Sequence, residues 1–326
     1  MPDQSTPWEE VYRDLSQQCG VVALTDWSQI DITGSDRATF LHNMCTNEIR
    51  KLSAGQCCEA FCTDVKGKIQ AQVFVFIEQD RISLLTVPGQ AERIIAQLGR
   101  YVIREDVELA DSTAKYAWWI VVGPQAHATL KQNTENENDI PTQNYNHATC
   151  TLAGQQGLVA RLPILWPGAL LVRTAATDSP LNGLDVPTID TDSPVWSSLR
   201  VESQLPLFGI DFDDSNLPQE VNRDAQSISF TKGCYLGQET VARIDALGHV
   251  NKKVVLVSIQ GTSVPKVGAK LLSGDSEVGT ITTPCWSPQA SRPAALAMVK
   301  RGANEIGSEM ESPAGSAVIV ESLQNQ

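Results

Sequence analysis

The sequence has no apolar run that approaches the length of about 20 residues that a membrane-spanning helix requires. Its first ten residues carry three carboxylates and two prolines, without the apolar centre of a secretory signal. These absences predict a cytoplasmic protein that has no membrane partner.

Nucleotide-binding signatures are also missing, because the chain contains no G-x-G-x-x-G motif and no P-loop. A net charge of −13 disfavours attraction of the whole protein to nucleic acid. Direct nucleic-acid binding is therefore not indicated. The few histidines form no spaced ligand set, and each is expected on the surface or in a loop: His42, His127, His147 and His249.

The cysteines are too scattered for a disulfide framework in a chain of this size. They are Cys19, Cys45, Cys57, Cys58, Cys62, Cys150, Cys234 and Cys285. The closest group, Cys57-Cys58-x3-Cys62, lacks the paired C-x2-C spacing of structural zinc and lies in a segment that alternates like a strand. We expect reduced thiols, buried in that strand, and no metal site.

With 326 residues, 42% hydrophobic and 19% charged, the sequence is long and apolar enough for two or three folded domains. Strands are expected at 20–27, 55–63, 67–77, 81–87 and 116–122, with 67–77 alternating at period two. Helices are expected after Ser35 or Asp36 and after Pro88 and Gly89. This mixture of hairpins and helices indicates an α+β fold and not a doubly wound sheet.

Further along, strands are expected at 157–162 and 169–174, and a helix at Ser193 and Pro194 that runs into Glu202. The polar segment 131–139 and the proline-containing segment 178–194 are expected to be irregular. From about residue 246 the chain changes to short strands separated by glycines, which suits a small barrel or sandwich. We therefore expect two domains, at 1–245 and 246–326.

The stretch Lys232-Gly233-Cys234-Tyr235-Leu236-Gly237-Gln238-Glu239 contains a thiol between two glycines, ahead of a helix expected from Gln238 to Ile244. A helix N-terminus and the Lys232 ammonium would both favour a thiolate at Cys234. Alternatively, the glycines supply turn geometry and Cys234 packs as a small hydrophobe. These eight residues by themselves leave both interpretations open.

The same stretch resembles the K-G-C-[YF]-x-G-Q-E signature of the YgfZ family, folate-binding relatives of the glycine cleavage T-protein, at every position. Weaker similarities to the family extend the resemblance over about residues 20 to 321. They comprise Gly34 to Leu41 with Thr46 and Asn47, Lys66 to Ile69, Trp196 to Glu202, Pro206 to Asp211, Leu217 to Glu220, Val278 to Thr282 with Ser287 and Pro288, and Ala294 to Ala297.

The resemblance implies an N-terminal module of two interleaved subdomains and a C-terminal β-barrel, arranged around a central channel that holds tetrahydrofolate. In the YgfZ branch it implies an accessory role in iron–sulfur cluster assembly or repair, with effects on cluster-dependent enzymes such as those that modify tRNA. The implied partners are folate and cluster-assembly or client proteins. Cys234 would act as the reactive thiol, and Lys232 would favour its thiolate.

The alternative function is that of a tetrahydrofolate-dependent aminomethyltransferase of the T-protein type. In the T-protein the strand similar to Gly67 to Gln72 ends in aspartates, whereas this chain has Gln70 and Ala71. An amide does not titrate near pH 7 and cannot replace a carboxylate that orients or deprotonates an amine. Because no Asp or Glu lies between Lys66 and Ile77, aminomethyl transfer is disfavoured. Whether the chain is an enzyme stays open.

The family also implies folate contacts from Glu202, Met44 and Asn47. A carboxylate at Glu202 would accept hydrogen bonds from the N–H and amino edge of the pterin. Without the resemblance, Glu202 would be interpreted as a solvated charge or a partner of Arg200. Met44 alone would be assigned to the core, because it shares the Phe40 face of its expected helix.

Overall fold

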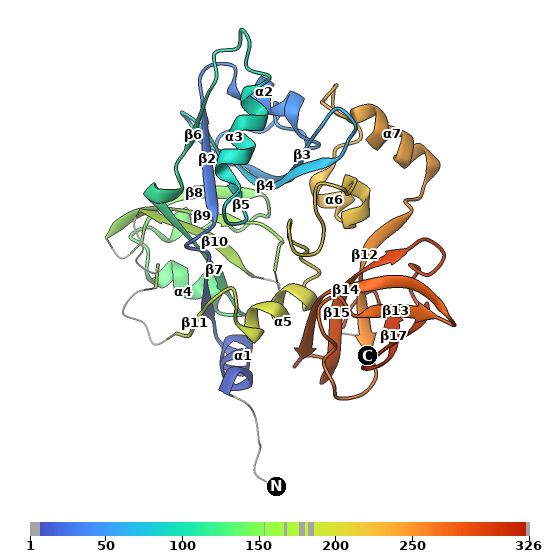
Figure 1. The fold of residues 1–326 in the computed structure, drawn as a ribbon. Coiled ribbons are helices and arrows are strands. Elements are labelled where there is room, and N and C mark those ends of the chain that lie inside the picture. Colours follow the sequence, from blue (N-terminus) through green and yellow to red (C-terminus); the bar gives the residue numbers. More distant parts are fainter. Residues whose placement is uncertain (1–6, 153, 166–167, 176–179, 182–185, 324–326) are drawn as a thin grey trace.

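The structure is a computed structural model that describes residues 7–152, 154–165, 168–175, 180–181 and 186–323. Two sheets lie on one side of the molecule and a closed barrel on the other, as Figure 1 shows, with α5 (Pro194–Glu202) between them. This arrangement confirms the α+β class. No helix in the described ranges is both long and apolar enough to cross a membrane.

The first sheet has five antiparallel strands in the order β3-β4-β5-β2-β6. Their bounds are β2 (Ser28–Thr33), β3 (Cys57–Thr63), β4 (Ile69–Ile77), β5 (Ile82–Thr86) and β6 (Glu108–Asp111). Helices α2 (Arg37–Met44) and α3 (Ala91–Gly99) pack on one face, where Leu41 and Ile94 share an apolar cluster with Val73.

The second sheet has six strands in the order β11-β1-β7-β10-β9-β8. Their bounds are β1 (Gly20–Ala23), β7 (Tyr116–Val122), β8 (Asn146–Leu152), β9 (Gln155–Arg161), β10 (Leu170–Ala175) and β11 (Thr188–Ile189). The chain enters this sheet at β1, forms the other sheet with β2 to β6, and returns at β7. This is the interleaving that the family resemblance implies. Helix α4 (Ala126–Gln132) packs Leu130 into the cluster on this sheet's outer face.

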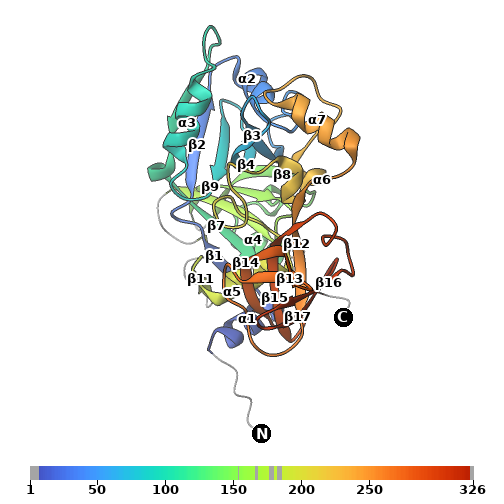
Figure 2. The same cartoon turned by 45° about the vertical axis from the view of Figure 1, so that its right-hand side comes forward.

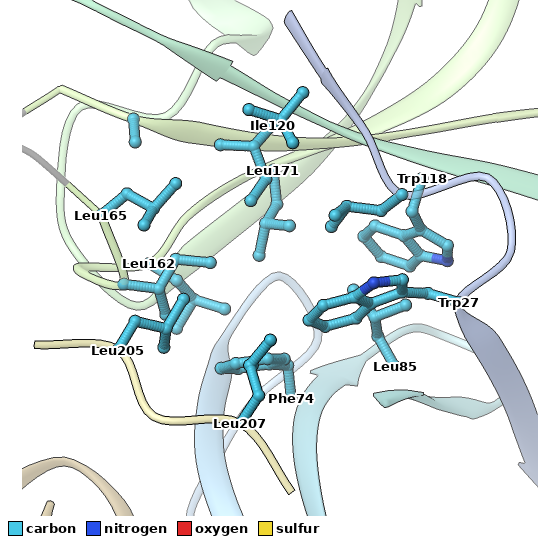
Figure 3. Packing of buried hydrophobic residues seen from close by; sticks show 14 of the residues in the cluster. Trp27, Phe74, Leu85, Trp118, Ile120, Leu162, Leu165, Leu171, Leu205 and Leu207 are labelled. Carbon is cyan, nitrogen blue, oxygen red and sulfur yellow. The ribbon is translucent and has the colours of Figure 1, made fainter. Parts of the chain in front are cut away.

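Strand β4 explains how the two sheets stack. Successive side chains of β4 point to opposite faces, so Val73 and Val75 pack towards α2 and α3. Phe74 and Phe76 pack towards the six-stranded sheet. Figure 3 shows Phe74 beside Trp27, with Trp118 and Ile120 of β7 above them. Both faces of β4 are therefore buried, and the predicted period of two is confirmed.

The closed barrel has the strand order β12-β15-β14-β13-β16-β17. Its strands are β12 (Lys252–Ile259), β13 (Lys270–Ser273), β14 (Ser276–Ser287), β15 (Arg292–Lys300), β16 (Glu309–Ser312) and β17 (Gly315–Ile319). Between α5 and the barrel lie α6 (Asp224–Ser227) and α7 (Gln238–Leu247). Short 3-10 turns occur at η1 (Thr113–Lys115), η2 (Glu137–Asp139) and η3 (Pro218–Val221).

Helix α5 carries the contact between the sheets and the barrel. Its Arg200 donates to Asp211 Oδ2 at 2.9 Å and to Thr283 Oγ1 of β14 at 2.8 Å, and all three side chains are buried. Asp211 also accepts from Thr282 and Thr283 at 2.6 Å each. A buried ion pair with these additional hydrogen bonds fixes the orientation of the barrel against α5.

Helix α1 (Pro7–Gln17) forms in the polar segment before residue 20, where no element was predicted. Tyr12 and Leu15 are buried, and Trp8 and Val11 pack against the same core. These four positions fall on one helical face at i, i+3, i+4 and i+7. The pattern was present in the sequence but is surrounded by carboxylates and amides.

Four strands were missed: β2, β6, β8 and β11. Of these, β2 is an inner strand, and the other three are at the edges of their sheets. An edge strand has one unpaired side. Strand β6 has no buried residue, and the buried residues of β8 do not alternate regularly, so neither shows the apolar pattern that reveals an inner strand. Strand β1 is also shorter than predicted and ends at Ala23. Asp36 occupies the position before α2, but its carboxylate accepts from Asp106 N at 2.9 Å and does not cap the helix.

The two segments predicted to be irregular are so only in part. Segment 131–139 contains the end of α4 and the turn η2, and segment 178–194 contains β11. Residues 178, 179 and 182–185 of the latter lie outside the described residues. The helix predicted from Pro194 is confirmed, and the Ser193 side chain accepts from Val195 N at 3.1 Å.

Candidate functional site

The segment from Lys232 to Glu239 forms a loop and the start of α7, and it lies over the end of α2 and the turn between β3 and β4. Leu236 N donates to Asn43 O at 2.9 Å, and Thr63 Oγ1 donates to Leu236 O at 2.6 Å. Gly237 has a φ of 81°, and a Cβ there would lie 2.4 Å from Asp64 O. Only glycine fits this approach, so the second glycine of the motif holds the loop against the turn.

Cys234 is the one exposed cysteine of the chain, and the other seven are buried. Helix α7 begins at Gln238, as predicted, with Gly237 as its N-cap. Cys234 therefore lies in the loop, three residues before the cap, and not in the first turn of the helix. The residue is open to solvent.

Lys232 is buried, with its ammonium turned towards the end of α2. Its Nζ donates to His42 O at 2.6 Å, Cys45 O at 2.7 Å and Asn47 O at 2.7 Å. These carbonyls belong to the last turn of α2 and the residues that follow it, where a helix leaves acceptors unpaired and a cation is favoured. Burial lowers the pKa of Lys232. The ammonium thus binds the carbonyls at the end of α2 and holds the start of the Cys234 loop against that helix.

Three buried thiols lie near this ammonium, on Cys45, Cys58 and Cys62. Burial raises the pKa of each of them, which keeps them protonated. Cys57, Cys58 and Cys62 are all buried in β3, as the sequence predicted.

Met44 and Asn47 lie beside the same loop. Met44 is half-buried against the cluster beneath α2. The Asn47 side chain donates to Glu59 O at 2.8 Å and Gln226 O at 3.0 Å, and accepts from Glu48 N at 2.8 Å. It joins α2, β3 and α6. The predicted folate contacts of both residues stay predictions.

Glu202, the last residue of α5, connects α1 and the barrel. Its Oε2 accepts from Tyr12 OH at 2.5 Å, and its Oε1 accepts from Ser287 Oγ at 2.5 Å and from Gln289 N at 3.3 Å. Burial raises the pKa of Glu202, and the hydrogen bonds from Ser287 and Tyr12 oppose this rise. Arg200 is not its partner, because that guanidinium pairs with Asp211.

The predicted site residues therefore fall into two groups. Lys232, Cys234, Met44 and Asn47 surround the end of α2, whereas Glu202 lies at the far end of α5. Figures 1 and 2 show α2 and α5 at separate levels of the molecule in both views.

A buried carboxylate that the sequence did not single out lies next to β4. Glu59 of β3 accepts from Gln72 Nε2 at 2.9 Å, and the guanidinium of Arg223 contacts both of its oxygens. Arg223 and Glu59 are 164 residues apart and form a buried ion pair. Glu59 is thus neutralised by a fixed cation, so it does not replace the aspartates that β4 lacks. No sequence signal connects such distant partners.

Two histidines that were expected on the surface or in a loop are buried instead. One is His147, in β8, and the other is His42. It lies on α2 and is 1% exposed, beneath the Cys234 loop. A histidine within an eight-residue helix that has little apolar periodicity gives no signal for burial.

Two family models match the chain, and together they cover more than half of it. The GCVT N-terminal domain matches residues 3–163, and the glycine cleavage T-protein C-terminal barrel domain matches residues 252–321. The chain belongs to the family of proteins that combine these two domains.

Relatives within this family are similar over most of the chain. The tRNA-modifying protein YgfZ of Hamiltonella defensa is 28% identical over 77% of this chain and 73% of its own length. That of Sodalis glossinidius is 27% identical over 81% of this chain and 80% of its own. A putative chloroplastic transferase of Arabidopsis thaliana is 25% identical over 88% of this chain and 66% of its own.

A solved structure supports the fold. The glycine cleavage system aminomethyltransferase T of Bartonella henselae superimposes with a TM-score of 0.81 at 17% identity, over 97% of this chain and 88% of that one. At this identity the similarity establishes the fold alone.

Proposed function

We propose that this chain is a YgfZ-type, folate-binding accessory protein that acts through the Cys234 thiol in the assembly or repair of iron–sulfur clusters, including those of tRNA-modifying enzymes. The observation that carries the proposal is the single exposed thiol, held in a loop whose every residue matches the YgfZ signature. Similarity to tRNA-modifying YgfZ proteins supports it.

The chemistry follows from the accessibility of Cys234. A thiolate is a soft ligand for iron and attacks the sulfur of a partner's disulfide or persulfide. In disulfide exchange the Cys234 sulfur bonds to one partner sulfur, the partner's S–S bond breaks, and the other partner sulfur leaves as a thiolate. The buried cysteines are shielded from a partner's sulfur and do not compete.

The aminomethyltransferase alternative is less well supported. Strand β4 carries no carboxylate, and the neighbouring Glu59 is already paired with Arg223. We therefore expect no transfer of a one-carbon unit from an aminomethylated lipoyl carrier to tetrahydrofolate.

The proposed role is tested in cells that lack their own YgfZ-type protein. Expression of this chain is expected to restore a cluster-dependent enzyme activity and the level of thiolated tRNA nucleosides. If the protein is present in soluble form but restores neither the enzyme activity nor the thiolated nucleosides, the proposal is wrong.

Folate binding is a separate part of the proposal. A carboxylate accepts about four hydrogen bonds, and Glu202 already accepts three. This count leaves Oε2 one acceptor position for a pterin donor beside Tyr12, whereas a paired pterin edge requires the tyrosine to move. Glu202 would hold the donor edge of the pterin, and the central channel stays a prediction.

Titration of tetrahydrofolate into the purified chain tests this part. Glu202→Gln is expected to weaken binding at least about ten-fold, because a charged acceptor is replaced by a neutral amide. Tyr12→Phe is the matched control, since it frees an acceptor site and leaves the charge in place, and we expect binding to be kept. Equal affinity of Glu202→Gln and the wild type would exclude Glu202 as the pterin ligand.

A further inference from the structure

The loop that carries Cys234 is fixed at both ends to adjacent residues of α2. Lys232 Nζ donates to His42 O at 2.6 Å, and Leu236 N donates to Asn43 O at 2.9 Å. Gly233 and Cys234 lie between these two contacts. The backbone of Cys234 is therefore held over the part of α2 that contains His42.

The His42 ring points towards this loop. A Cβ built on Gly233 would lie 3.7 Å from His42 Nε2 and 3.6 Å from an Arg50 guanidinium nitrogen. His42 Nε2 is buried and has no hydrogen-bond partner among the residues that the structure describes. A buried polar atom without a partner is costly, and such atoms often mark a functional site. Gly233, the residue before Cys234, has no side chain to cover it.

The other ring nitrogen determines which form the imidazole takes. His42 Nδ1 lies 3.0 Å from Glu48 Oε1, and the Ile49 N–H approaches the same atom at the longer distance of 3.4 Å. The carboxylate favours a proton on Nδ1, as in other carboxylate–histidine pairs. The neutral ring then carries its lone pair on Nε2, on the side of the Cys234 loop.

The surroundings of the His42 ring favour its neutral form. Burial and the nearby cations Lys232 and Arg50 lower the pKa of His42, and Glu48 opposes them. A neutral imidazole with a free lone pair is a base, and an imidazolium beside Glu48 is the form that the carboxylate stabilises.

We propose that His42 is the base that takes the proton of the Cys234 thiol, with Glu48 positioning the ring. The S–H bond breaks, its electron pair stays on sulfur, and the proton bonds to Nε2 while the Nδ1 proton remains with Glu48. The Arg50 guanidinium lies beside Gly233, the residue before this thiolate. This inference rests on the proposed role of Cys234 and names the residues that activate it.

The alkylation rate of Cys234 by iodoacetamide, measured against pH on the full chain, tests the proposal. Because the other cysteines are buried, the native protein reports on Cys234 alone. His42→Gln is expected to slow alkylation at pH 7 at least about ten-fold and to move the rise in rate to higher pH. His249→Gln, at the histidine nearest to Cys234 in sequence, is expected to leave the profile unchanged. An unchanged profile for folded His42→Gln would overturn the proposal.

Two further measurements separate a base from a structural or purely electrostatic role. Arg50→Gln is expected to slow alkylation at low salt only, because exposed charges are screened, whereas the His42 effect should persist at high salt. In the wild type, alkylation of Cys234 should shift the NMR titration of the His42 C2 proton, and no shift would overturn the proposal without any variant. Alkylation that depends on His42 would stand even if the cellular rescue failed.

Discussion

Replacing Cys234 by alanine is expected to abolish the rescue of cluster-dependent enzymes and tRNA thiolation, while the protein folds normally. Cys234 is exposed, and substitution of an exposed side chain changes the free energy of unfolding by within about 0.5 kcal/mol. The loss would therefore come from the chemistry of the thiol. Rescue is measured as thiolated nucleosides in digested tRNA, and unfolding by urea titration of the purified variants.

Cys234→Ser is the matched variant, because a hydroxyl of similar size keeps the shape of the loop but neither forms persulfides nor binds iron as a soft ligand. It is expected to fail like alanine. Full rescue by either variant would show that the thiol does not carry the function, and the signature would then serve the geometry of the loop.

Replacing Lys232 by methionine is expected to lower the free energy of unfolding by about 3–5 kcal/mol. Methionine fills much of the same space, but the carbonyls of His42, Cys45 and Asn47 lose a charged donor, and each unpaired buried acceptor costs about 1–3 kcal/mol. The contact of the ammonium with the Tyr235 ring, 4.9 Å away, is lost as well.

Lys66→Met is the control, because Lys66 is an exposed lysine of the neighbouring turn, and its effect should stay within about 0.5 kcal/mol. The sequence predicted a chemical role for Lys232 as the cation that favours the Cys234 thiolate. If Lys232→Met is as stable as the wild type but its Cys234 is alkylated more slowly, the result would support the predicted chemical role of Lys232. If the variant is less stable but each folded molecule is alkylated at Cys234 at the wild-type rate, Lys232 is the residue that holds α2 and the loop together.

The sequence by itself determined most of the inner strands, though not β2, and the position of the motif. The period-two alternation predicted for β4 is found in the structure. Both faces of this strand are buried, so each apolar side chain has a fixed direction. The start of α7 and the terminal barrel followed from local signals in the same way, since capping glycines, turn glycines and short apolar runs act over a few residues. The K-G-C-Y-L-G-Q-E match, read from adjacent residues, indicated the family.

Only the tertiary structure decided what surrounds Cys234. Lys232 is two residues away in sequence, yet its ammonium binds carbonyls about 190 residues earlier in the chain. His42 and Glu48 reach the loop because α2 packs beneath it, and Arg223 meets Glu59 across 164 residues. Side-chain direction and long-range pairing depend on how the elements pack against each other. A local pattern therefore identified the thiol, and the packing of α2 against the loop supplied the base beside it.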